Sequence, residues 1–302
     1  MIALGFDTSN YTTSCAWFDG TTGENSGRLL EVKSGELGLR QSDALFQHVR
    51  RLPDIAGELS IPGEIGSVGA STRPRAVDGS YMPCFLAGES QAKVLSEALD
   101  VPFYAFSHQQ GHLAAVLWSA CRMDLLEHEF LAWHLSGGTT ELLLVRPGLR
   151  AEKIGGTRDL SAGQLIDRTG QMLDLDFPAG KAIDSLAGDL QTGAYPVKVQ
   201  NMEFSLSGMQ NKTEQMHKAG ASDAETASFA LSCVAEAVKK ATVQALEQYG
   251  GLPVVFTGGV ASNSQLRRKM ASLGAVFGPP RFSTDNAMGI AVLTYYAEKQ
   301  HG

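Results

Sequence analysis

Two strand–turn–strand patterns, about 130 residues apart, constrain the fold of this chain most strongly. The apolar run "IALGFD" (2–7) ends in an acid and is followed, after small polar residues, by the run "SCAWFD" (14–19). The same arrangement recurs where "FLAWHLSGG" (130–138) meets "TTELLLV" (139–145). Short apolar runs on both sides of small turn residues predict hairpins. Their repetition predicts two related lobes, which we place at 1–122 and 123–302.

Helical and extended patterns alternate around these hairpins. Residues 43–59 show helical spacing through Leu45, Val49, Leu52 and Ile55, although Pro53 is expected to kink or break that helix. The other segments follow the same alternation, with strands expected at 65–71, 101–107 and 252–259 and helices at 87–100, 108–123, 227–251 and 262–274. This predicts an α/β fold. A last helix, at about 286–299, is expected to return to the N-terminal lobe.

Composition limits the partners and the compartment. The 302 residues carry a formal charge of -7, which argues against a large basic nucleic-acid surface. Three short basic clusters are visible, at 50–51, 239–240 and 267–269, and each is compatible with a solvated helix face. The four cysteines show no metal-binding spacing and are expected to be buried free thiols in a reducing compartment. With neither a signal peptide nor an apolar stretch of the ~20 residues that span a bilayer, the expected location is cytoplasmic, with no membrane contact.

Three polar turns are candidates for binding phosphate. Asp7 and Ser9 lie in the turn "DTSNYTTS", and residues 136–139 form the glycine-containing turn of "LSGGTTEL". Gly258 and Gly259 end the strand "VVFT" before a helix whose expected cap is Ser262 or Asn263. Backbone amides in such turns hold anions, and an acid at a strand end can hold a metal or position a nucleophile. Each turn alone is equally compatible with an ordinary connection, but together they favour a nucleotide site.

Two such hairpin loops and the late Gly-Gly turn resemble those of the actin, Hsp70 and sugar-kinase (ASKHA) superfamily. That resemblance implies a two-lobed fold in which ATP lies in a cleft between duplicated lobes.

Two histidines, His108 and His112, stand four residues apart at the start of an apolar run. Imidazoles at i and i+4 share a helix face and can share one cation, but they need a third ligand from elsewhere. Asp285, at the head of the last helix, is a candidate, although it serves equally well as an N-cap. A zinc protease needs Glu directly after the first histidine, where this chain has Gln109. A peptidase of that type is therefore disfavoured.

Six motifs follow one another as in the TsaD family of tRNA threonylcarbamoyladenosine synthases, which this chain resembles over nearly its whole length. They are "HQQGH", "SGGTTEL", "SAGQLIDRTGQMLDLDFPAG", "FSLSGMQ", "TGGVASNSQLR" and "STDNAMGIA". The resemblance implies an iron or zinc ion held by His108, His112 and Asp285. It also implies that ATP or an acyl-adenylate contacts a set of residues comprising Ser136, Gly137, Gly138, Thr139, Asp167, Gly180, Asp184, Gly258, Gly259 and Asn263.

The departures from the family pattern lie in loops expected to do chemistry. Tyr11 and Thr12 stand where the family has two acids, and Gln110 and Thr139 replace a Glu and a His. The loop at 71–83 carries Arg73 and Arg75, which could grip a phosphate or a carboxylate or could be solvated.

The leading interpretation is a metal-dependent transferase in which Asp7 and Ser9 are candidate catalytic residues. It would move a threonylcarbamoyl group from its adenylate to the N6 amino group of adenosine in tRNA. The lost acids favour one alternative, a non-catalytic nucleotide-binding paralogue that regulates a true synthase. A small-molecule carbamoyltransferase or kinase is a further alternative. Because the chain is acidic, tRNA is expected to bind through a partner protein, in a heterodimer or homodimer.

Overall fold

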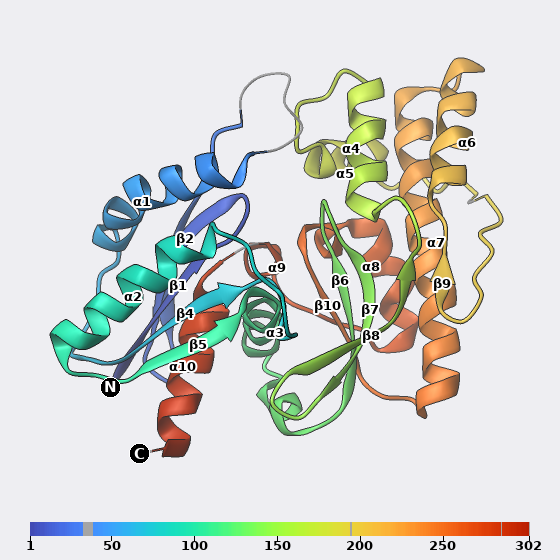
Figure 1. Cartoon of the computed structure of the whole chain (residues 1–302). Helices are drawn as coiled ribbons and strands as arrows, with labels where there is room; N and C mark the ends of the chain where they lie inside the picture. The colour runs from blue at the N-terminus through green and yellow to red at the C-terminus, as the bar shows by residue number, and fades with distance from the viewer. Residues whose placement is uncertain (33–38, 194, 285, 302) are drawn as a thin grey trace. The chain divides into compact units, whose positions relative to one another are not determined.

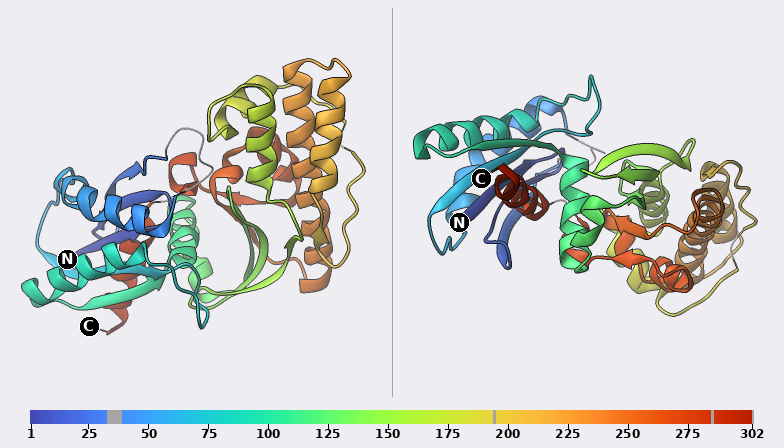
Figure 2. Two further views of the ribbon diagram at one scale, coloured as in Figure 1. Left: turned by 45° about the horizontal axis from the view of Figure 1, so that its top comes forward. Right: turned by 90° about the horizontal axis from the view of Figure 1, so that it is seen from below.

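The computed structural model describes residues 1–32, 39–193, 195–284 and 286–301. Two compact units make up the chain. The first unit consists of Met1–Met123 together with Thr284–Gly302, and the second unit consists of Asp124–Ser283. The C-terminal helix α10, red in Figures 1 and 2, therefore belongs to the same unit as the N-terminal strands.

A five-stranded sheet with the order β3-β2-β1-β4-β5 forms the first unit's centre. Its strands are β1 (Ile2–Thr8), β2 (Thr12–Phe18), β3 (Gly23–Leu29), β4 (Ile65–Arg73) and β5 (Phe103–Ser107). The first three strands are antiparallel, whereas β1, β4 and β5 are parallel. Parallel strands end at the same edge of a sheet, so this edge brings together polar residues at or near the ends of β1, β4 and β5, namely Asp7, Ser71 and Ser107.

Helices cover both faces of this sheet. The helices are α1 (Gln41–Gly57), α2 (Phe85–Leu99), α3 (His108–Ser119) and α10 (Met288–His301). Leu4 and Phe6 of β1 point to a core that contains Ile55 of α1 and Ala92 of α2. Gly5 points the other way and meets the backbone of α10 at Ala291. Alternation along β1 thus separates the two helix layers.

Helix α1 differs from its sequence prediction in two respects. It continues through Pro53 to Gly57, so the expected break does not occur. Proline leaves the carbonyl of Val49 without its helical donor, but Val49 lies on the exposed side, where water can replace that donor, and its side chain is 48% exposed. The buried face contains His48 in the place predicted for Val49. His48 can be buried because both its ring nitrogens have hydrogen-bond partners.

Helix α10 touches its neighbours backbone to backbone. A Cβ atom at Gly289 would lie 1.8 Å from the carbonyl oxygen of Gly111 in α3, and one at Gly5 would lie 2.4 Å from the backbone nitrogen of Ala291. Such distances leave no room for any side chain, so glycine is required at both positions.

A six-stranded sheet with the order β11-β10-β6-β7-β8-β9 forms the second unit's centre. Its strands are β6 (Phe130–Leu135), β7 (Thr140–Arg146), β8 (Arg150–Thr157), β9 (Glu203–Phe204), β10 (Val254–Thr257) and β11 (Val276–Phe277). The main helices are α4 (Ala162–Met172), α5 (Gly180–Ala187), α6 (Ser207–Lys218), α7 (Asp223–Tyr249) and α8 (Ser264–Met270), with the single turn α9 (Pro280–Ser283). Trp133 and Phe256 pack with Val238 of the long helix α7 in the main core. The helix cap predicted at Ser262 or Asn263 is confirmed at Asn263, which accepts a hydrogen bond from the backbone nitrogen of Leu266.

Asp159 ties the motif "FSLSGMQ" to the end of β8. Its carboxylate accepts hydrogen bonds from the hydroxyls of Ser205 and Ser207 and from the backbone nitrogens of Leu160 and Leu206. Partial burial works to raise the pKa of Asp159, but these hydrogen bonds outweigh it and hold the pKa well below its ordinary value. Asp159 is therefore a structural anchor for the start of α6.

Two further expectations concern the cysteines and the membrane. Cys15, Cys84 and Cys233 are buried free thiols as predicted, whereas the prediction was wrong for Cys121, which is exposed after the end of α3. Within the described ranges, no helix is both long and apolar enough to cross a bilayer.

We expect Gly289→Ala to lower the free energy of unfolding by about 1–3 kcal/mol, because its Cβ would overlap backbone that cannot move independently. Chemical denaturation monitored by circular dichroism measures the change. Gly57→Ala is the matched control, since a Cβ at this last residue of α1 meets open space. Equal stability of Gly289→Ala and the wild type would contradict the close contact.

We expect Asp159→Asn to cost about 1 kcal/mol at pH 7, a modest value because the exposed carboxylate is screened by water. A depressed folded-state pKa contributes stability above the unfolded value and loses it as pH falls through the folded value. The difference between wild type and variant should therefore shrink in denaturation curves taken below about pH 4. Ser205→Ala, which removes one donor, should show a smaller loss in the same pH window. A gap that does not change with pH would rule out the anchoring role.

Candidate functional site

The two histidines predicted from their spacing face each other at the start of α3. Ser107 caps this helix: its hydroxyl accepts from the backbone nitrogen of Gln110, and its own backbone nitrogen donates to the Gln110 side chain. The helix therefore begins at His108, and His112 follows one turn later on the same face. Their Nε2 atoms lie 3.0 Å apart, close enough to bind one ion together.

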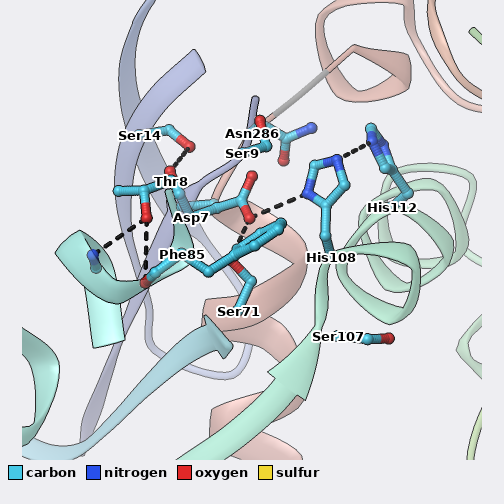
Figure 3. A network of polar contacts seen from close by, with 12 residues as sticks. Asp7, Thr8, Ser9, Ser14, Ser71, Phe85, Ser107, His108, His112 and Asn286 are labelled. Carbon is cyan, nitrogen blue, oxygen red and sulfur yellow. Dashed lines mark hydrogen bonds and ion pairs between the residues drawn. The ribbon is translucent and has the colours of Figure 1, made fainter. Parts of the chain in front are cut away.

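Asp7 orients the first of these histidines. Its Oδ1 atom lies 3.0 Å from Nδ1 of His108 and also accepts a hydrogen bond from the Ser71 hydroxyl (Figure 3). A carboxylate assigns the proton to Nδ1 and leaves the lone pair on Nε2, the form in which imidazole binds a metal. The other carboxylate oxygen, Oδ2, is buried and has no hydrogen-bond partner among the described residues. Two facing imidazole nitrogens with a carboxylate behind one of them suit a divalent ion, which still needs a third ligand.

The third ligand implied by the family resemblance, Asp285, lies outside the described residues. Among the residues that the structure does describe, no group of three His, Cys, Asp or Glu side chains could hold a metal. The metal assignment thus stays a prediction that rests on His108, His112 and the carboxylate behind them.

Ser9 lies in the turn that follows β1. Its side chain is buried, and its carbonyl oxygen lies 2.7 Å from Nε2 of His48. Tyr11 and Thr12 lie where the family resemblance implies two acids. The Tyr11 carbonyl accepts a hydrogen bond from the backbone nitrogen of Leu30, and Thr12 is the first residue of β2. The turn between β1 and β2 is therefore built without any carboxylate after Asp7.

The glycine turn of the second unit connects β6 to β7. The Ser136 backbone nitrogen donates to the Thr139 carbonyl, and the Thr139 nitrogen donates to the Ser136 hydroxyl. Ser161, the capping residue of α4, fixes the turn because its hydroxyl donates a hydrogen bond of 2.6 Å to the Gly137 carbonyl oxygen. A Cβ at Gly137 or Gly138 would meet nothing within 4 Å. The turn presents open backbone, which suits an anion.

Several predicted nucleotide residues have internal partners in the second unit. The Asp184 carboxylate accepts from the Asn263 side chain and from both the hydroxyl and the backbone nitrogen of Ser264. Asp167 accepts from the Ala179 backbone nitrogen, and burial raises its pKa. Gly180 begins α5 with open space around it. Any ligand contact from Asp184 competes with its role at the start of α8.

The Gly-Gly pair at 258–259 follows β10. Gly258 has a φ of +92°, and a Cβ there would lie 2.2 Å from the Leu135 carbonyl oxygen. Gly259 begins the short 3-10 helix η2 (Gly259–Ser262). The need for glycine at 258 is therefore explained by packing against the end of β6.

Two residues of the site, Ser71 and His48, were not predicted from the sequence, and two predicted residues, Arg73 and Arg75, have no assigned role. Ser71 lies two residues before the end of β4, and only the parallel pairing of β1 with β4 reveals that it reaches Asp7. The sequence did not indicate a role for His48, because it is a single polar residue on an otherwise apolar helix face. Arg73 and Arg75 are exposed. Their role stays a prediction.

Comparison with known proteins decides the family. The family model described as "TsaD: tRNA N6-adenosine threonylcarbamoyltransferase" matches residues 79–292. The chain belongs to the TsaD family. A tRNA N6-adenosine threonylcarbamoyltransferase of Chloroherpeton thalassium is 30% identical to it over 98% of this chain and 92% of that protein. The predicted family and the predicted transferase class are both confirmed at this level.

Solved structures confirm the predicted fold class. HypF of T. kodakarensis has a TM-score of 0.61 at 14% identity, covering 99% of this chain and 48% of that one. A ROK family glucokinase from Streptomyces griseus, solved with glucose and AMPPNP, has a TM-score of 0.54 at 9% identity, covering 98% of this chain and all of that one. At such identities the likeness establishes the sugar-kinase-like α/β fold and nothing about the ligand.

We expect His108→Ala and His112→Ala each to lower bound iron or zinc sharply, because each removes one of two facing nitrogen ligands. Asp285→Ala tests the residue predicted as third ligand. The measurement is metal content by mass spectrometry on protein purified without chelator, with circular dichroism to verify folding. His128→Ala, which changes an exposed histidine outside the pair, is the control. Full occupancy in both histidine variants would exclude the site.

Proposed function

We propose that this chain transfers a threonylcarbamoyl group from threonylcarbamoyl-adenylate to the N6 amino group of adenosine in tRNA. Family membership supports the reaction class. The observation that carries the proposal within this chain is the continuous arrangement of Asp7, His108 and His112. A structural histidine pair needs no buried carboxylate behind it, whereas a metal-binding imidazole usually donates its other N–H to a carboxylate, a backbone carbonyl or water, and His108 has a carboxylate in this place.

Each part of the arrangement has a role in this proposal. His108, His112 and Asp285 would hold an iron or zinc ion, which would supply Lewis acidity to the carbonyl under attack. Asp7 keeps the proton of His108 on Nδ1 and the ring in place. The open backbone of Gly137 and Gly138 holds the adenylate phosphate. Ser9 lies two residues from Asp7, and we propose that it contacts the substrate.

We propose that this chain acts in the cytoplasm as part of a heterodimer or homodimer. The acceptor tRNA would bind through the partner chain. Most cations of the three basic clusters already have internal partners. Arg51 pairs with Glu31, Arg268 pairs with Asp189, and Lys240 and Lys269 both pair with Glu236. Arg267 donates to two backbone carbonyls. Few cations of these three clusters remain for a phosphate backbone, whose binding requires several on one surface.

A non-catalytic paralogue is the second candidate, and the turn after β1 favours it. With Tyr11 and Thr12 in backbone roles, this turn lacks the two acids of the family pattern. Such a paralogue would still bind the nucleotide and would regulate a true synthase.

The test is transfer of threonylcarbamoyl from its adenylate to a tRNA transcript, with the modified adenosine quantified by mass spectrometry. The wild type should modify tRNA, and His112→Ala should lose on the order of 100-fold in rate. Gly138→Val should fold, because the position is open, but should bind the adenylate more weakly. His128→Ala should keep the wild-type rate. Nucleotide binding without any transfer, alone or with a partner, would favour the paralogue instead.

A further inference from the structure

His48 is a buried histidine of α1, and its two ring nitrogens contact residues on the two sides of the turn between β1 and β2. Its Nε2 atom lies 2.7 Å from the Ser9 carbonyl oxygen, and its Nδ1 atom lies 2.8 Å from the Thr13 hydroxyl. The side chain is completely buried. No part of the metal or nucleotide assignment uses it.

The two partners determine the tautomer of His48. A carbonyl oxygen only accepts, so Nε2 must carry the proton. Nδ1 is then an acceptor, and the Thr13 hydroxyl donates to it. Burial lowers the pKa of His48, which keeps the ring neutral. The imidazole therefore acts as a fixed bridge with one donor and one acceptor.

This bridge joins both strands on either side of the turn. Ser9 directly follows β1, and Thr13 lies in β2 opposite Thr8. Gln41, at the start of the same helix, donates to the side chain of Asn10 within the turn. The end of β1 is thus held at two places from α1. Asp7, two residues before Ser9, depends on the position of this strand end to reach His108.

We propose that His48 is a positioning residue: its bridge between Ser9 and Thr13 holds the end of β1 so that the Asp7 carboxylate stays aligned with His108. The inference deepens the proposed function, since it concerns the same Asp7–His108 pair. His48 acts through the backbone of Ser9 and touches neither histidine of the pair.

A merely stabilising role for His48 predicts a different result. Leu52 lies on the same buried face of α1 and belongs to the core of the first unit, so truncating it removes apolar contacts but leaves the bridge intact. Leu52→Ala is the matched control, and its midpoint of chemical denaturation should fall clearly below that of the wild type. If stability alone matters, the folded fractions of Leu52→Ala and of a His48 variant will be equally active.

Two variants separate the hydrogen bonds of His48. The Gln amide nitrogen can occupy the place of Nε2 and donate to Ser9, so His48→Gln keeps the contact with the strand end. The Asn oxygen can occupy the place of Nδ1 and accept from Thr13, so His48→Asn loses the contact with Ser9. We expect His48→Gln to stay within about threefold of the wild-type kcat and His48→Asn to lose between tenfold and about 100-fold, with KM for tRNA unchanged.

The test combines transfer kinetics with nuclear magnetic resonance of the ring protons. In the wild type, in His48→Gln and in Leu52→Ala, the Nδ1 proton of His108 should show the downfield resonance of a hydrogen bond to Asp7. In His48→Asn this resonance should shift or vanish. This spectroscopic measurement decides the proposal even if the wild type transfers no threonylcarbamoyl group. An unchanged resonance or an unchanged kcat in folded His48→Asn, or absence of the resonance from the wild type, overturns it.

Discussion

The site of the first unit depends on a backbone contact that only glycine permits. Helix α10 lies against β1 at Gly5 and against α3 where Gly289 meets Gly111. With side chains at these positions, α10 would be pushed away from the sheet, and α3 would move with it. Because α3 begins at His108, the same movement would carry the first imidazole away from Asp7. The absence of side chains at Gly5 and Gly289 therefore lets α10 pack directly against both β1, which carries Asp7, and α3, which carries the histidine pair.

The buried Asp7 carboxylate is costly to hold in place. Removing an ion from water costs several kcal/mol unless hydrogen bonds and opposite charge compensate. Ser71 and His108 compensate one oxygen, and the other has no hydrogen-bond partner in the described part of the chain. A cation bound to the histidine pair would add the missing favourable electrostatics. Burial of this carboxylate therefore favours binding of a cation next to it.

Periodicity was sufficient to predict most of the elements but not their detailed contacts. Strands β1, β2, β6 and β7 were predictable because they are buried along most of their length, and helix α7 because it is long and has a buried, mainly apolar side. The edge strand β3 has a polar, partly exposed sequence and gives no such signal. The histidine pair followed from its spacing, since i and i+4 always share a helix face. Ser71 and His48 could not be found, because their partners are distant in sequence and are set by strand order and helix rotation.

The turns that follow β1 and β6 serve corresponding places in the two sheets but are built differently. The second unit's turn is made of backbone: glycines at 137 and 138 leave it open, and one capping serine fixes it from α4. The first unit's turn is held by side chains, through His48 and Gln41 of α1. A turn made of open backbone can offer its amides to an anion, whereas a turn held by side chains has its geometry set by a helix outside it. The first turn carries Tyr11 and Thr12, where the family resemblance implies two acids, so it offers no carboxylate after Asp7, and His48 and Gln41 fix its position.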